Sequence, residues 1–231
     1  MQLFYLPDIA QATLSEAESL HCVKVLRHQT GDTLHVTDGA GHLYQAQILE
    51  AKAKACKLHN FQLVREEEPK GFHIHLAIAP TKNIERMEWF VEKTIELGID
   101  QITFLKCQNS ERKGINLERM EKKAVGAMKQ SLHLRLPQLS EEIPFSTFLK
   151  QAEAEQKFIA YVDENHTKHL KNCLKENQRY LVLIGPEGDF TSEEIQYALA
   201  SGFMPISLGN SRLRTETAGL AACMMCQWVN E

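Results

Sequence analysis

Two short segments near the end of the chain combine residue types that bind and position a small polar ligand. The first is GPEG at residues 185–188, and the second is LGNSRLRTET at residues 208–217. Glycine leaves backbone N–H groups exposed and lets a ligand approach the main chain closely. The second segment adds Arg212, Arg214 and Glu216, a density of charge that packing does not require. Together the two segments predict a binding site with charged side chains beside it.

Each glycine segment lies between an expected strand and an expected helix. The apolar run at residues 181–184 is typical of a buried parallel strand, and a second strand is expected at residues 206–208. Thr191 and Glu194 have the spacing of a capping box, which starts a helix, and the last helix is expected from about Thr215. Ligands of open α/β sheets bind outside the carboxyl ends of the strands. The alternative is that both segments are ordinary strand-to-helix turns. GPEG alone would favour this alternative, because short glycine motifs often match by chance. The charged second segment favours a binding site instead.

The middle of the chain has the pattern of a strand–helix–strand unit. Residues 72–79 alternate as a strand does, residues 84–97 are amphipathic and end at Gly98, and residues 101–106 form the next expected strand. Another strand is expected at residues 157–162. The core-facing side of the expected helix is formed by Met87, Phe90, Val91, Thr94 and Ile95. This order predicts an α/β fold with a parallel sheet and a right-handed crossover.

The beginning of the chain is richer in short strands than the remainder. Strands are expected at residues 32–37 and 43–49, on either side of the hairpin sequence DGAG. The sequence EEEPKG at residues 66–71 has the composition of a linker, with like charges, a proline and a glycine. We therefore expect two domains, at residues 1–68 and 72–231.

Positive charge is concentrated in one stretch of a chain whose net charge is −4. Residues 106–135 carry eight Lys and Arg side chains and three Glu side chains. Arg112 and Lys113, just past an expected strand, and Gln130 with Arg135 favour contact with a polyanion. Residues 119–123 are more simply explained as a solvated helix face.

A second candidate for contact with RNA phosphate lies at residues 15–27, which are helical in period. The expected apolar face holds Leu20, Val23 and Leu26. Lys24 and Arg27 lie on the other side, where a plain solvated face is the alternative to an RNA-binding edge.

Composition and motifs exclude several classes of protein. No apolar run approaches the length of a membrane span, and the first residues lack the features of a signal peptide, so we expect a cytoplasmic protein. The six cysteines are expected to be reduced, and Cys223 and Cys226 to pack in a core rather than bind metal. No metal is expected. The GxGxxG signature of a dinucleotide-binding dehydrogenase is absent.

The sequence resembles the SPOUT class of methyltransferases and, within it, the RsmE family, which methylates uridine N3 in small-subunit ribosomal RNA. The resemblance lies in IGPEG at residues 184–188, LG at 208–209 and LRTETA at 213–218. HCVKVLR at residues 21–27 resembles the PUA-like N-terminal module of that family, so the likeness covers nearly the whole chain. One departure is Asp189, where the family pattern usually has glycine.

The resemblance implies an α/β protein with an N-terminal PUA-like β-barrel and a C-terminal SPOUT domain, whose parallel sheet ends in a trefoil knot. It also implies a homodimer that binds S-adenosyl-L-methionine (SAM) and acts on 16S rRNA or the small ribosomal subunit. The implied cofactor-binding residues are Leu183, Ile184, Gly185, Pro186, Glu187, Gly188, Leu208, Gly209, Leu213, Arg214, Thr215 and Thr217. The expected RNA-binding residues are Lys24, Arg27, Lys82, Arg112, Lys113 and Arg135.

Three residues are the expected catalytic groups. Arg112 and Arg214 are candidates to stabilise the anion that develops as uridine N3 loses its proton. Glu216 either accepts that proton or anchors Arg214, and a carboxylate that only satisfies a helix N-terminus is the plain alternative. Another RNA target within the class and a non-catalytic RNA-binding dimer are the alternative functions. The intact cofactor segments argue against the second of these.

Overall fold

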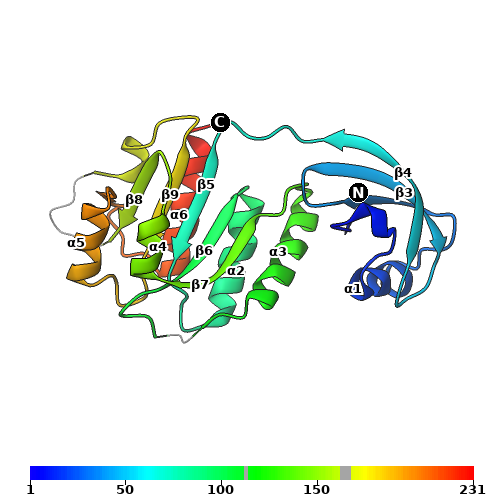
Figure 1. The fold of residues 1–231 in the computed structure, drawn as a ribbon, viewed down its shortest axis with the longest axis horizontal. Helices are drawn as coiled ribbons and strands as arrows, with labels where there is room; N and C mark the ends of the chain where they lie inside the picture. The colour runs from blue at the N-terminus through cyan, green and yellow to red at the C-terminus, as the bar shows by residue number, and fades with distance from the viewer. Residues whose placement is uncertain (112–113, 162–167) are drawn as a thin grey trace. The chain divides into compact units, whose positions relative to one another are not determined.

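The computed structural model describes residues 1–111, 114–161 and 168–231, which divide into two compact units (Figure 1). One unit contains Met1–Pro69 and Val125–Leu136, and the other contains Lys70–Ala124 and Pro137–Glu231. Helix α3, Leu117–Ser131, therefore begins in one unit and ends in the other. The sequence did not indicate that residues 125–136 group with the N-terminal segment. The boundaries of independently folding domains stay a prediction.

The N-terminal unit is built on a mixed four-stranded sheet. Its strands are β1 (Leu3–Tyr5), β2 (Thr33–Thr37), β3 (His42–Glu50) and β4 (Lys57–Glu66), in the order β1-β2-β3-β4. The β1–β2 pair is parallel and the other two pairs are antiparallel. The predicted hairpin is confirmed in β2 and β3. Where the resemblance implied a β-barrel, the structure has this four-stranded sheet. Among the described residues, no pairing between β1 and β4 closes it.

The predicted apolar face of the helix at residues 15–27 is wrong for Leu20 and Leu26, which are exposed, whereas Val23 packs against the core as predicted. Helix α1, Glu16–Leu20, continues as a π-helical turn, η2, His21–Val25, and a 3-10 turn, η1 (Ile9–Gln11), precedes it. Ser19 is buried instead, because its hydroxyl donates to one main-chain carbonyl and accepts from the N–H of another segment. The side chain of Leu20 is 51% exposed. The two hydrogen bonds of Ser19 to the main chain therefore decide which side of the helix is buried, and the spacing of the apolar residues does not.

The end of α3 and the residues after it complete the core of the N-terminal unit. Leu134 packs with Leu3 and Leu43 in one buried cluster. The Lys129 ammonium donates to the carboxylate of Glu18, which is also buried. Residues 1–69 alone would leave these side chains without their partners.

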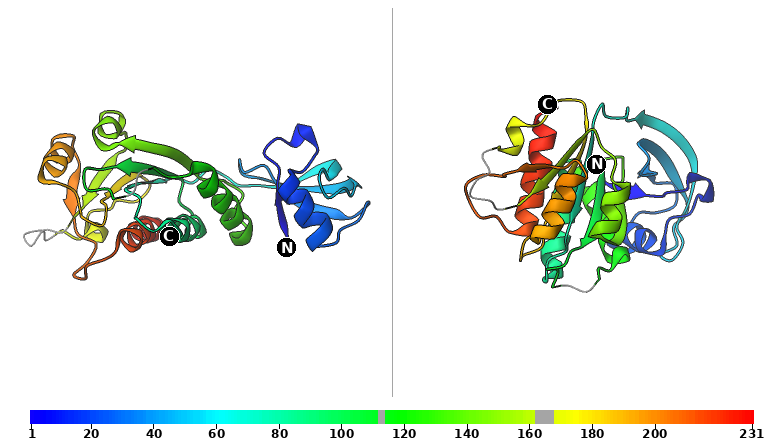
Figure 2. Two further views of the ribbon diagram at one scale, coloured as in Figure 1. Left: turned by 90° about the horizontal axis from the view of Figure 1, so that it is seen from below. Right: turned by 60° about the vertical axis from the view of Figure 1, so that its left-hand side comes forward.

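The second unit is a parallel six-stranded sheet between two layers of helices (Figure 2). Its strands, all parallel, run in the order β10-β8-β9-β5-β6-β7. They are β5 (His73–Ile78), β6 (Gln101–Lys106), β7 (Gln138–Pro144), β8 (Gln156–Ala160), β9 (Arg179–Ile184) and β10 (Met204–Ile206). Helices α2 (Ile84–Glu96) and α6 (Thr215–Trp228) cover one face, and α4 (Phe145–Gln151) and α5 (Ser192–Ala200) cover the other. A short 3-10 turn, η3, spans Leu170–Asn172.

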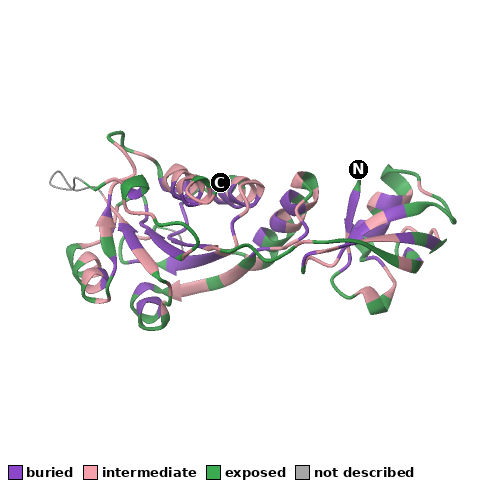
Figure 3. Cartoon of the chain, turned by 90° about the horizontal axis from the view of Figure 1, so that it is seen from above, coloured by how far each residue is buried: buried purple, intermediate pink, exposed green. Residues whose placement is uncertain are grey.

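The core of this unit lies on both faces of its central strands, which are buried in Figure 3. The predicted strand–helix–strand unit is confirmed as β5, α2 and β6. The predicted core side of α2 is also confirmed, since its buried residues are Met87, Phe90, Val91, Thr94 and Ile95. β7 and α4 were not predicted from the sequence.

Gly219 is required by the close packing of α6 against α2. A Cβ atom at this position would lie 2.5 Å from Cε2 of Phe90 and 3.1 Å from Cδ1 of Ile78. We expect Gly219→Ala to lower the free energy of unfolding by ~1–3 kcal/mol, because the core would be overpacked. Gly126→Ala on α3 is the matched control, since nothing lies within 4 Å of its Cβ position. The control should stabilise by ~0.5–1 kcal/mol. Urea unfolding measures both, and a Gly219→Ala protein as stable as wild type would contradict the prediction.

His75, on β5, makes the stability of this unit depend on pH. Its Nε2 lies 2.8 Å from Oγ1 of Thr103. Burial, with smaller effects of the nearby His73 and Arg179, lowers the pKa of His75 from 6.5 to about 3. Because this pKa is lower in the folded state, protonation favours unfolding. The stabilisation is fully present above pH 6.5 and is lost as the pH falls toward 3.

We expect this histidine to reduce the free energy of unfolding by at most ~1.4 kcal/mol for each pH unit within that window. His75→Gln should weaken the pH dependence, because the amide has no proton to gain there. Urea unfolding at a series of pH values, followed by circular dichroism, measures the slope. Equal slopes for the two proteins would show that His75 is not responsible.

Candidate active site

The first glycine segment lies directly after β9, at the carboxyl edge of the sheet. Gly185 is packed against the ring of Phe190, which would lie 3.1 Å from a Cβ atom at residue 185. The predicted capping box after it is confirmed. Thr191 Oγ1 accepts from the Glu194 N–H at 3.2 Å, and Glu194 Oε2 accepts from the Thr191 N–H at 3.0 Å. The segment between β9 and α5 is therefore held at both ends, by the packing of Gly185 and by the capping box of α5.

The loop that follows β6 holds the first glycine segment from the side. Asn109 Nδ2 donates to the carbonyl oxygens of Gly188, at 3.2 Å, and Asp189, at 3.1 Å. The N–H of Gln108 donates to Glu194 Oε1 at 2.9 Å. These contacts come from a part of the chain about eighty residues earlier, and the sequence did not indicate them.

Asp189 has a left-handed backbone, with φ of 60°. Glycine adopts this conformation at no steric cost, which accounts for the glycine of the family pattern, and aspartate tolerates it better than most residues. Its Oδ1 accepts from the N–H of Phe190 at 2.8 Å. The side chain therefore supports the turn.

The strand before the second glycine segment ends two residues earlier than the sequence predicted. The strand expected at residues 206–208 is β10, Met204–Ile206, an edge strand that accommodates Pro205. Leu208 and Gly209 consequently lie in the loop beyond it. Gly209 has φ of 130°, a conformation open almost only to glycine.

Helix α6 begins next to this loop, as predicted. Arg214 is its N-cap residue, is exposed, and makes no side-chain capping hydrogen bond. The first N–H groups of a helix have no partner within the helix, so those of α6 can bind an acceptor on a ligand. Thr215 and Glu216 are buried, and Thr217 is half-buried.

Glu216 has a different partner from the one considered in the sequence. Its Oε1 lies 3.8 Å from Nε of Arg86, and no contact with Arg214 is found among the described residues. Arg86 Nη1 also donates to Glu187 Oε1 at 3.2 Å. Arg86, in the first turn of α2, was missed because nothing in its local sequence indicates partners more than a hundred positions away. The structure thus brings Glu187 and Glu216 to one guanidinium.

The expected RNA-binding residues have varied surroundings. Lys24 and Arg27 are exposed in the N-terminal unit. Lys82 Nζ lies 3.0 Å from Glu111 Oε2. Arg135 donates to the carbonyl oxygens of Ala40 and Glu67, so its guanidinium supports the N-terminal unit. Arg112 and Lys113 lie outside the described residues. All six RNA-binding assignments stay predictions.

Much of the positive charge of residues 106–135 is balanced by nearby carboxylates. Arg119 pairs with Glu88, and Lys123 pairs with Glu92, both on α2. This agrees with the interpretation of residues 119–123 as a solvated helix face.

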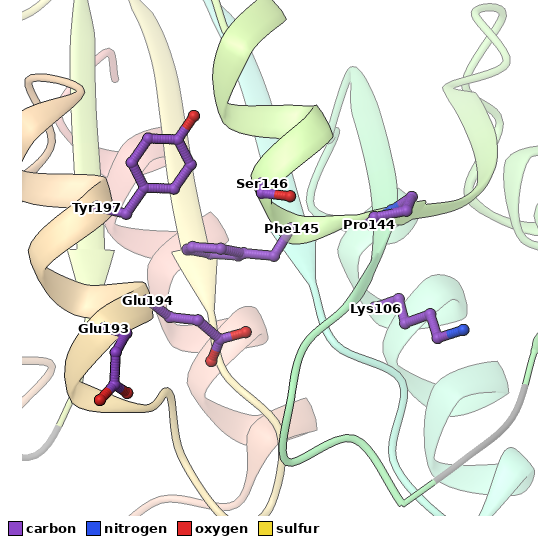
Figure 4. Close-up of a pocket in the computed structure, with 7 residues that line it drawn as sticks. All are labelled: Lys106, Pro144, Phe145, Ser146, Glu193, Glu194 and Tyr197. Atoms are coloured by element: carbon purple, nitrogen blue, oxygen red, sulfur yellow. The ribbon is translucent and has the colours of Figure 1, made fainter.

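A pocket of about 380 Å³ lies beside this site, between α4 and α5 (Figure 4). Its aromatic walls are Phe145 and Tyr197, and Lys106 lies at its edge. None of the expected cofactor residues lines it. Two of its lining residues connect the pocket to the first glycine segment: Glu194 caps α5, and the ring of Phe145 contacts that of Phe190, which packs against Gly185.

Cys223 and Cys226 pack in the core, as predicted. Burial raises the pKa of both thiols, to about 12 for Cys226, so they are poor nucleophiles and poor metal ligands. No group of three or more candidate metal ligands is found in the described part of the chain. Among the same residues, no helix is long and apolar enough to cross a membrane.

The chain matches two families of known domains. Residues 66–227 match the RNA methyltransferase domain, and residues 14–59 match the RNA methyltransferase PUA domain. A curated relative from Buchnera aphidicola, ribosomal RNA small subunit methyltransferase E, is 31% identical, and the match covers 95% of this chain and 89% of the relative. The chain belongs to the RsmE family.

Solved structures agree with this family and with the fold. A probable rRNA-methyltransferase from Porphyromonas gingivalis is 43% identical, with a TM-score of 0.92 over 100% of this chain and 98% of its own. Ribosomal RNA small subunit methyltransferase E from Neisseria gonorrhoeae, bound to S-adenosyl methionine, is 25% identical, with a TM-score of 0.83 over 100% of this chain and 98% of its own. The α/β fold with an N-terminal PUA-like module, typical of RsmE proteins, is therefore confirmed.

Proposed function

We propose that the protein transfers a methyl group from SAM to N3 of a specific uridine in 16S rRNA. The observation that carries the proposal is the meeting of both glycine segments at the carboxyl edge of one parallel sheet, in a chain of the RsmE family. This is the edge at which α/β sheets bind their ligands. The protein is expected to act in the cytoplasm, where ribosomal RNA is found.

The two segments fit the proposed cofactor. Residues 185–188 supply main-chain groups after β9, Gly209 supplies a left-handed turn, and the first turn of α6 has unpaired N–H groups. The buried oxygen Oε2 of Glu216 has no partner among the described residues, as expected where a ligand completes the site. When bound, SAM supplies an electrophilic methyl group attached to a positively charged sulfur.

The residues of the chain have separate tasks in this reaction. Arg214 stabilises the negative charge that develops on the uracil ring as N3 loses its proton. Glu216 accepts a hydrogen bond from the ligand through its buried Oε2. Arg112 contacts an RNA phosphate, so Arg112→Ala should weaken RNA binding. The slope of the logarithm of the binding constant against the logarithm of the salt concentration should fall by roughly one, the value for one lost phosphate contact.

The N-terminal unit is proposed to bind RNA through Lys24 and Arg27. Deleting residues 1–68 should leave a fragment that binds SAM but methylates RNA poorly. Because Leu134 would lose its cover, we expect the fragment to need Leu134→Asn to stay free of aggregates. Calorimetry and filter binding test this, and loss of SAM binding even with Leu134→Asn would refute the division into two domains.

The protein is proposed to be a homodimer whose chain is threaded as a trefoil knot. The support for a dimer is a stripe on α6 with helical spacing that is not fully buried. It consists of Leu220, Ala221, Met224 and Trp228, and Trp228 is 61% exposed. Apolar stripes of this kind mark protein interfaces. Light scattering would measure the oligomeric state.

A titration of the protein with SAM, followed by methyl transfer to small subunits and to naked 16S rRNA, tests the proposed function. Binding followed by transfer to a uridine N3 would support it. Absence of any heat or thermal shift with SAM would refute it, and RNA binding without SAM binding would favour a non-catalytic RNA-binding dimer. The comparison of the two RNA substrates also identifies the form that is methylated.

A further inference from the structure

Arg86 lies between the two segments that form the proposed cofactor site. Its Nη1 donates to Glu187 Oε1 at 3.2 Å, and its Nε lies 3.8 Å from Glu216 Oε1. Glu187 belongs to the loop after β9, and Glu216 belongs to the first turn of α6. One guanidinium on α2 therefore lies within ion-pair distance of two segments that are separate in sequence.

The second carboxylate oxygen of Glu216 is left without a donor. Glu216 is 6% exposed, and its Oε2 is buried and accepts no hydrogen bond from any residue that the structure describes. A buried acceptor without a partner is costly, so such atoms are rare unless a ligand supplies the donor. The N-terminal end of α6 favours negative charge at this position. The site therefore presents a carboxylate oxygen to a donor from outside the described chain.

We propose that Arg86 is a positioning residue, which holds Glu187 and Glu216 so that Glu216 Oε2 accepts a hydrogen bond from an N–H group of the bound ligand. This inference rests on the proposed function. The N–H group belongs either to SAM, which carries amino groups, or to the uridine, whose N3–H must be removed before methylation. Both are N–H donors, and binding and rate measurements distinguish them.

A purely structural ion pair would behave differently. The side chains of Arg86 and Glu187 are 35% and 31% exposed, and pairs of this kind contribute little to folding. A small displacement of a reacting group, in contrast, lowers a catalytic rate by up to about 100-fold. Loss of rate or of ligand affinity without a matching loss of stability is therefore the signature of positioning.

The variants are chosen to separate charge from geometry. Arg86→Lys keeps the cation but cannot contact two carboxylates in one plane, so we expect about a 10-fold effect. Arg86→Gln and Glu216→Gln should have effects of about 100-fold. Arg119→Gln is the matched control, because Arg119 pairs with Glu88 of α2 outside both glycine segments. It should keep wild-type values.

Each variant is titrated with SAM by calorimetry in the absence of RNA, assayed for single-turnover methyl transfer at saturating SAM, and tested for thermal unfolding. If SAM is the donor, its Kd rises in the Arg86 and Glu216 variants. If uridine is the donor, Kd is unchanged and the transfer rate falls. Both results support the role of Arg86, and Arg86→Lys carries the test if Arg86→Gln is unfolded.

Wild-type values for Arg86→Lys, Arg86→Gln and Glu216→Gln would overturn the positioning role of Arg86 while leaving the proposed function intact. A wild-type protein that binds no SAM would overturn the proposed function, and this inference with it.

Discussion

Gly209→Val is expected to abolish SAM binding while leaving the protein folded. Valine cannot adopt φ of 130° without strain, so the loop between β10 and α6 must change its path. The loop lies outside the sheet and its core, whereas the main-chain groups that it presents belong to the proposed site. Isothermal titration calorimetry measures the loss of binding, which we expect to be at least ~100-fold.

Gly31→Val is the control for this variant. Gly31 also has a left-handed backbone, with φ of 93°, but it lies in the N-terminal unit, and nothing is within 4 Å of its Cβ position. Both variants should therefore lose a similar amount of stability, and only Gly209→Val should lose SAM binding. If Gly209→Val binds SAM as the wild type does, the loop after β10 does not form part of the cofactor site.

Arg214→Ala is expected to lower the rate of methyl transfer by ~100-fold, the scale found when one charge-stabilising group is removed. The guanidinium is exposed at the start of α6 and makes no capping bond, so little stability depends on it. Arg214→Lys should restore the rate only in part, because an ammonium lacks the planar fork. Single-turnover kinetics at saturating SAM measure the change.

Arg179→Ala is the control, because Arg179 is an exposed arginine at the opposite, amino end of β9. It should methylate RNA at the wild-type rate. An Arg214→Ala protein that is as active as this control would remove Arg214 from the catalytic groups.

The sequence predicted those elements whose signals are local. The core side of α2 follows from residues three or four positions apart, and the start of α5 follows from Thr191 and Glu194. The parallel sheet follows from the order of strands and helices. Residues 21–27, which resemble the RsmE N-terminal module, lie in the N-terminal unit. The other residues that carry the resemblance lie at the end of β9, in the loops after β9 and β10, and in the first turn of α6, so the structure places them at one edge of the sheet.

The sequence did not predict features that depend on distant partners. Arg86, Asn109 and residues 125–136 acquire their roles only when segments far apart in the chain meet. Strand β7 was missed because it is an edge strand, which need not be apolar, and it contains Glu141 and Glu142. In each case the role of the residue depends on its position in the folded protein, which the residues next to it in sequence do not indicate.

The division of the N-terminal unit between residues 1–69 and 125–136 has a consequence for the order of folding during synthesis. Leu3 and Glu18 leave the ribosome roughly ten seconds before Leu134 and Lys129, at the usual rates of translation. Until then, one apolar cluster is incomplete and one buried carboxylate lacks its cation. The N-terminal unit therefore matures only after α3 has been made, and a nascent chain that stalls before residue 136 exposes a surface that chaperones and proteases recognise.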